Sequence, residues 1–136
     1  MTVTRVMTAR VRSEHTPPEV LRANLPLVTV LLRYDPADPW ALKMLIGAQA
    51  WEFARELLAD ALADEGLVGE GDVRILAWAD TVKVILSSPS GTARLFFGRG
   101  DLEHALDDTE ALVPLGAEGA RFDFDREIGL LGRDAA

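Results

Sequence analysis

Six short segments of this sequence have the residue patterns of β-strands, and these segments limit the folds open to the chain. Residues 5–12 place Met7, Ala9 and Val11 on one side and polar residues on the other, the period of two of a half-buried strand. The other segments are apolar and rich in β-branched or aromatic residues: 26–34, 40–46, 71–78, 81–88 and 91–98. Short turns at 79–80 and 89–91 predict antiparallel pairing of the last three.

The stretch RYDPADPW, residues 33–40, connects the second and third segments. Pro36 and Pro39 have no N–H to donate and hold the preceding aspartates in extended conformations, so the chain is predicted to turn here. The aspartate carboxylates can accept backbone N–H bonds within such a turn. The segment 26–34 before the turn is apolar on both faces, which predicts burial on both sides.

The period of the apolar residues changes at Trp51. In WEFARELLADALADEG, residues 51–66, one helical stripe is apolar and the opposite side is charged. The apolar stripe contains Trp51, Ala54, Leu58, Ala61 and Leu62, and the charged side contains Glu52, Arg55, Glu56 and Asp60. A helix is therefore predicted to begin near Trp51 and to end at Gly66.

A second helix is predicted over residues 101–112, with Asp101 as its N-cap. After a loop over 113–121, the segment 122–132 is predicted to form a short strand or helix that carries Phe124, Ile128 and Leu131. The chain thus contains two strand-strand-strand-helix units in a single domain, residues 1–136. This order predicts an α+β fold, with helices packed on one face or end of an antiparallel sheet.

The composition limits the chemistry that the chain can support. The sequence has no cysteine, and its two histidines, His15 and His104, are far apart, so disulfides and thiolate zinc sites are excluded and a metal centre is not expected. No signal peptide is recognisable at the N-terminus, and no apolar stretch approaches the roughly 18 residues of a membrane span. We therefore expect a soluble, cytoplasmic protein.

The charge is distributed unevenly along the chain. The formal net charge is −8, yet residues 1–33 carry five arginines against two glutamates. Most of the surface would repel a phosphate backbone, so nucleic-acid binding is disfavoured. Arg5, Arg10 and Arg12 on the first strand are the candidate patch if a nucleic acid is bound at all.

No pattern of catalytic residues stands out. The carboxylate pairs Asp35/Asp38, Asp107/Asp108 and Asp123/Asp125 are typical of solvated turns and helix surfaces. The serines in SSP, residues 87–89, lack a nucleophile elbow, and the glycines in GRG, residues 98–100, lack the rest of a phosphate loop. We therefore expect neither an enzyme nor a cofactor.

Aromatic residues suggest a binding surface instead. Trp51 and Trp78 are predicted to be core residues, the more frequent environment for tryptophan in a small domain. Tyr34 and Trp40 flank the proline turn, where a rigid aromatic side chain could anchor a protein interface. Ordinary core positions are the equally plausible alternative for both.

Several stretches together resemble one family: LRYDPADPWAL, WEFARELLADAL, GDVRI, ILSSPSGTARL and LVPLGAEGARFDFDREI. In this order they are similar to the SsgA-like proteins, the sporulation and cell-division regulators of filamentous actinobacteria, over roughly residues 30–131. Two features differ from the family. Trp40 stands where members often have Tyr, and the connection within GDVRILAWADTVKV is shorter than expected.

The resemblance implies a non-enzymatic protein that helps position septa during sporulation, in some members by recruiting the tubulin-like protein FtsZ. It also implies a Whirly-like fold, similar to single-stranded nucleic-acid binders, and a homotrimer. The predicted partners are thus further copies of the chain and division proteins such as FtsZ or another SsgA-like protein, at the division septum. The alternative is a single-stranded nucleic-acid-binding protein. A subunit interface is expected on the sheet, at the segments 26–32 and 40–46, which are apolar on both faces.

Overall fold

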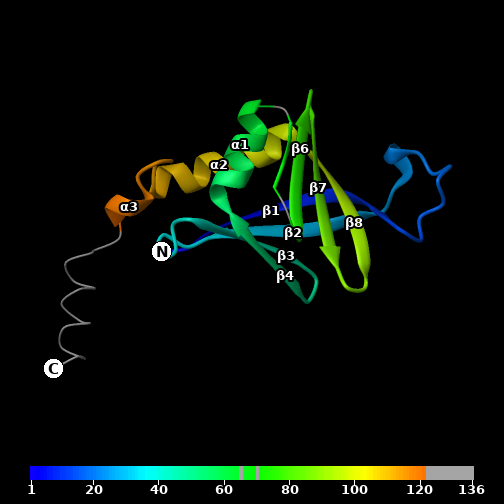
Figure 1. Cartoon of the computed structure of the whole chain (residues 1–136), viewed down its shortest axis with the longest axis horizontal. Coiled ribbons are helices and arrows are strands. Elements are labelled where there is room, and N and C mark those ends of the chain that lie inside the picture. The colour runs from blue at the N-terminus through cyan, green and yellow to red at the C-terminus, as the bar shows by residue number, and fades with distance from the viewer. Residues whose placement is uncertain (65, 70, 122–136) are drawn as a thin grey trace.

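The computed structural model describes residues 1–64, 66–69 and 71–121 (Figure 1). One antiparallel sheet of eight strands has the order β4-β3-β2-β1-β8-β7-β6-β5. The strands are β1 Val3–Ser13, β2 Leu27–Tyr34, β3 Ala41–Ile46, β4 Gln49–Ala54, β5 Leu67–Val68, β6 Val73–Trp78, β7 Thr81–Ser88 and β8 Gly91–Gly98. The helices are the short 3-10 helix η1 Arg22–Asn24, α1 Arg55–Asp64, α2 Arg99–Leu112 and α3 Glu118–Arg121.

The long first strand joins two halves of the sheet. The first part of β1, from Val3 to Arg10, pairs with β2, and its last part, from Arg10 to Ser13, pairs with β8. All six predicted strands are present, as β1, β2, β3, β6, β7 and β8. The two predicted tight turns also form, because Trp78 pairs with Thr81 and Ser88 pairs with Gly91.

The predicted start of the first helix is wrong. Residues Gln49–Ala54 form β4, an edge strand paired with β3, and α1 begins only at Arg55. Gly47, with a φ of +57°, allows the tight turn that reverses the chain between the two strands. Pairing with β3 therefore overrides the helical spacing of Trp51 and Ala54.

Other boundaries also differ from the prediction. The helix α2 begins at Arg99 with Gly98 as its N-cap, and Asp101 lies inside its first turn. The strand β5 and the helix α3 were not predicted, the latter lying in the expected loop. The order is therefore four strands and a helix, twice, rather than three strands and a helix. The predicted segment 122–132 lies outside the described residues.

The strand β2 is buried on one face only, contrary to the prediction. Val30, Leu32 and Tyr34 are buried, whereas Leu27 is 60% exposed and Thr29 is exposed on the opposite face. Within the described residues, no β2 side chain on this second face is fully buried. We call the buried side of the sheet the core face and the opposite side the outer face.

The helices cover only part of the core face. Leu58 and Ala61 of α1 and Leu102, Ala105 and Leu106 of α2 join sheet residues in one buried cluster. In Figure 1, α1 and α2 lie together on one side of the sheet, while the β3–β4 and β7–β8 hairpins extend beyond them. The core face thus has a covered end, beneath the helices, and an open end.

Candidate protein-interaction surfaces

The proline turn is fixed by hydrogen bonds within the chain. The Oδ1 atom of Asp35 accepts the N–H of Ala37 at 2.9 Å, and the Asp35 carbonyl accepts the N–H of Asp38 at 2.9 Å. The prediction that a carboxylate accepts a backbone N–H within this turn is thus confirmed for Asp35. The Tyr34 hydroxyl donates to the carbonyl of Pro39 at 2.9 Å. These bonds hold the turn in one conformation.

The two aromatic residues beside this turn lie in different environments. Tyr34 is 1% exposed and belongs to the core cluster, so within this chain it offers no surface to a partner. Trp40 is 48% exposed, while its carbonyl accepts the N–H of Arg55 at 2.7 Å. Trp40 is therefore an exposed aromatic residue on an anchored backbone, the combination that an interface anchor needs.

Arg55 lies beneath this turn and is fully buried, whereas the sequence pattern placed it on the charged, outward side of a helix. Its guanidinium donates to the carbonyl oxygens of Val113 and Pro114, at the end of α2, and to the hydroxyl of Thr109. It also lies over the Tyr34 ring, 5.0 Å from the centroid. Arg55 thus connects the start of α1 to the end of α2.

The guanidinium of Arg55 also forms an ion pair with Glu118 of α3. The hydrogen bond from Arg55 is the main cause that lowers the pKa of the Glu118 carboxyl. Within the described residues the Arg55 Nε atom has no hydrogen-bond partner. No sequence pattern indicated this role, because an arginine on the charged side of a predicted helix is usually solvated.

Apolar side chains form a row across the outer face of four strands. Val6 pairs with Leu31, Leu31 with Leu45, and Leu45 with Ala50, so these residues share one face and adjoin one another. Val6 is 66% exposed, and Leu31 and Leu45 are half-buried. We call Val6, Leu31, Leu45 and Ala50 the outer apolar row. Leu31 and Leu45 of this row lie in the segments 26–32 and 40–46, where a subunit interface was predicted, so the row is a candidate interface.

The other two tryptophans are half-buried rather than core residues. Trp51 lies on the core face at the open end. Trp78 lies on the outer face, where the guanidinium of Arg22 stands 5.7 Å and the Lys83 amine 5.9 Å from its ring centroid. The contact with Arg22 attaches η1 to the sheet.

The three arginines of the candidate nucleic-acid patch do not form one free surface. Arg5 faces the helices and pairs with Asp108 of α2 at 2.7 Å, which lowers the pKa of that carboxyl. Arg10 donates to the Leu25 carbonyl at 2.8 Å, and Arg12 donates to the carbonyls of Pro17 and Val20. Each guanidinium therefore binds its own chain, on opposite faces of β1.

The described residues do not form a metal-binding cluster. Within them, no three His, Asp or Glu side chains are close enough to hold a metal ion. Asp35 and Asp38 are exposed, and Asp108 is engaged by Arg5. The pair Asp123/Asp125 lies outside the described residues. No helix in the described ranges has the length and apolar character needed to cross a membrane.

Comparisons with known proteins identify the family. The family model of the Streptomyces sporulation and cell division protein SsgA matches residues 28–118, which extend from β2 into α3. A sporulation-specific cell division protein SsgB from Salinispora tropica is 39% identical over 115 residues, covering 76% of this chain and 79% of the relative. SsgB from Streptomyces coelicolor is 42% identical over 108 residues, covering 71% and 76%.

Solved structures agree with this assignment. A structure from work on SsgB mutations that correlate with longitudinal cell division during sporulation of Streptomyces coelicolor gives a TM-score of 0.71 at 34% identity, covering 90% of this chain and 98% of that chain. An SsgA-like sporulation-specific cell division protein from Thermobifida fusca gives a TM-score of 0.65 at 31% identity, covering 93% and 94%. This chain therefore belongs to the SsgA family of sporulation and cell division proteins.

Proposed function

We propose that this protein is a non-enzymatic regulator that helps position or assemble the division septum during sporulation. The family match over residues 28–118 carries the proposal, because it spans most of the described fold. In this proposal the protein acts as an adaptor, and its partner is the tubulin-like protein FtsZ or another SsgA-like protein. Trp40 supports an adaptor role, since it is exposed on a backbone fixed by the Arg55 N–H.

A deletion of the gene in its own host, followed by microscopy of sporulating cells, tests this role. We expect septa to be missing or misplaced, and a fluorescent fusion of the intact chain to restore them and to gather at the septum. Normal septation in the deletion strain, or a fusion that stays dispersed while septa form, would contradict the proposal.

Recruitment of FtsZ is tested with purified components. Polymerised FtsZ is pelleted with the chain at physiological salt, and the Trp40→Ala variant is compared with Trp40→Tyr. We expect the intact chain and the tyrosine variant to pellet with the polymer, and the alanine variant to stay in solution. A chain that never pellets would exclude direct recruitment and leave another SsgA-like protein as the partner to test in the same way.

We also propose that the chain forms a homotrimer through the outer face of its sheet. The outer apolar row supports this. Val6 is 66% exposed, and the exposure of its apolar side chain to water is unfavourable, so contact with a second copy would stabilise the assembly. Val6→Lys should reduce the mass measured by light scattering, whereas Thr8→Lys, exposed on the same face of β1, should change it less. A monomer mass for the unaltered chain at micromolar concentration would refute the trimer.

The Whirly-like fold that the resemblance implies is proposed as well. The order of four strands and a helix, repeated once, supports two matching units. Binding of single-stranded nucleic acid is not favoured, because Arg5, Arg10 and Arg12 bind their own chain and the net charge is −8. Retention of labelled single-stranded DNA that weakens steeply with salt would reverse this judgement.

A further inference from the structure

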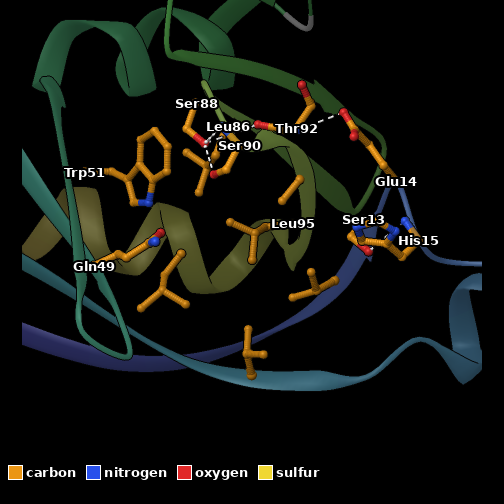
Figure 2. Close-up of a pocket in the computed structure, with 15 residues that line it drawn as sticks. Ser13, Glu14, His15, Gln49, Trp51, Leu86, Ser88, Ser90, Thr92 and Leu95 are labelled. Carbon is orange, nitrogen blue, oxygen red and sulfur yellow. Dashed lines mark hydrogen bonds between the residues drawn. The ribbon is translucent and has the colours of Figure 1, made fainter.

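The open end of the core face forms a groove of about 310 Å³ (Figure 2). Its apolar lining comes from β1 and from strands on both sides of it, namely Val11, Val28, Ile46, Trp51, Leu86 and Leu95. Figure 2 shows Trp51 and Gln49 on the left of the groove, Ser88 and Ser90 of the β7–β8 turn at its top, and Glu14 and His15 on the right. The lining continues the buried core face, and no residue of α1 or α2 contributes to it.

One side of this groove is the free edge of the sheet. Among the strands of the described residues, β4 is the first in the sheet order and pairs only with β3. Because Ile46 and Gln49 pair across the two-residue turn, the alternation of an antiparallel ladder directs the N–H and C=O groups of Ala50 and Glu52 away from β3. Among the described residues, these groups have no backbone partner.

The free edge and the groove are related by geometry. A strand added beside β4 would continue the pleat, so every second side chain would point to the core face, as Trp51 does. Those side chains would lie over the apolar lining of the groove. Backbone bonds to an edge and pockets for alternate side chains are the two parts of recognition by strand addition.

The groove also has one charged residue with no cationic partner. The Oε1 atom of Glu14 accepts the N–H of Thr92 at 3.1 Å, which holds the carboxylate beside the groove. A Cβ at position 91 would stand only 3.1 Å from Glu14, so the side chain uses the space that Gly91 leaves. No lysine or arginine of the described residues forms an ion pair with Glu14. A basic occupant would complement it.

We propose that the β4 edge and this groove together bind an extended segment of a partner protein. The segment carries apolar residues at alternate positions and a lysine or arginine that reaches Glu14. This inference rests on the adaptor role proposed above and deepens it by naming the chemistry of the segment that is bound. The net charge of −8 further favours a basic segment over an acidic one.

Fluorescence anisotropy with short labelled peptides tests the site on the full-length chain. The probe is the peptide Lys-Val-Thr-Val-Thr-Val-Lys, and the controls are a scrambled peptide of the same composition and a peptide with glutamate at both ends. We expect saturable binding of the probe, and binding weaker by about tenfold for each control, the effect of losing one or two favourable contacts. Absence of saturable binding by the probe would overturn the proposal.

Variants locate the bound peptide. Ala50→Pro removes an outward N–H and should weaken binding about tenfold, whereas Ala50→Thr, which keeps the N–H, should not. Ala93→Leu narrows the groove and should weaken binding also. Glu14→Lys should reverse the preference between the lysine and glutamate peptides. If Ala50→Pro fails to fold, as judged by circular dichroism, the Ala93→Leu and Glu14→Lys variants decide alone.

The outcomes separate this site from the wider function. Binding unaffected by the edge, groove and charge variants would refute the site even if the deletion strain fails to septate. Binding that follows all the variants, in a strain with normal septation, would support the site and refute the role in septation. A change in oligomer mass caused by Glu52→Pro, which removes an outward N–H outside the outer apolar row, would show that a second copy occupies the edge and would overturn the assignment to a partner protein.

Discussion

The covered end and the open end of the core face share the same strands but lie in different environments. Met44 and Ile46 are two residues apart on β3 and point to the same side, yet Met44 is 1% exposed in the buried cluster that the helices join and Ile46 is half-buried beside the groove. The strand pattern is the same at both positions. The difference arises from α1 and α2, which cover one end only, so burial here is decided by helix placement.

The polar groups differ between the ends as well. At the covered end, Arg55 is completely buried and satisfies carbonyl oxygens at the end of α2. At the open end, Glu14 is exposed and has no cationic partner among the described residues. We infer that the covered end supplies stability and that the open end is available for binding. The predictions below test this division.

The largest effect is expected at Arg55. Replacing Arg55 with Ala leaves the carbonyls of Val113 and Pro114 and the carboxylate of Glu118 without their donor, which should lower the free energy of unfolding by about 3–5 kcal/mol. Urea denaturation measures it. Arg5→Ala removes an ion pair exposed to solvent and is the control, with a much smaller loss. Equal losses in the two variants would contradict the role of Arg55.

Truncations on β3 compare the two ends directly. Met44→Ala opens a cavity in the buried cluster and should lower the free energy of unfolding by about 2–5 kcal/mol, whereas Ile46→Ala, beside a groove that is already open, should lower it by about 1 kcal/mol. Both variants truncate a residue on the same face of β3. The difference between their unfolding free energies therefore measures how much the helices contribute by covering one end of that face. Urea unfolding of both variants measures this difference. Equal losses of unfolding free energy would mean that the open end is as well packed as the covered one.

The ion pair at the covered end predicts a dependence on pH. The hydrogen bond from Arg55 holds the Glu118 pKa below its ordinary value of 4.5. A carboxyl with a lowered pKa contributes stability above its ordinary pKa and loses it as the pH falls through the lowered value. We therefore expect the difference in unfolding free energy between the intact chain and Glu118→Gln to shrink below pH 4.5. A difference in unfolding free energy that stays constant from pH 7 to pH 3 would show that the Arg55–Glu118 ion pair is not the source of this difference.

The sequence predicted the strands well because their patterns are local. Residues 5–12 alternate as a half-buried strand does, and β1 contains all of them. It failed at Trp51, where the spacing to Ala54 and Leu58 also fits a helix and only the pairing with β3 selects the strand. The two-residue turn with Gly47 was the available signal, since such turns are typical of hairpins.

The candidate site was predictable only in part. The proline turn follows from Pro36 and Pro39, but the opposite environments of Tyr34 and Trp40 depend on which side of β2 meets the helices. Arg55 is buried because three helices meet around it, a property of tertiary structure. The groove likewise exists because the β3–β4 and β7–β8 hairpins extend beyond α1 and α2. No local sequence pattern predicts how far the hairpins extend past the helices.

Trp40 gives the smallest expected change in stability and tests whether the covered end also carries a binding surface. Its side chain is 48% exposed and its backbone is held by the Arg55 N–H, so Trp40→Ala should change the free energy of unfolding by only about 0.5 kcal/mol. A core tryptophan would cost about 3–5 kcal/mol instead. Urea unfolding and light scattering on one sample read stability and assembly together. With Trp40→Tyr as the control that keeps an aromatic ring, loss of assembly in the alanine variant alone would place a protein interface at Trp40. A large loss of stability, or assembly unchanged in both variants, would confine binding to the open end.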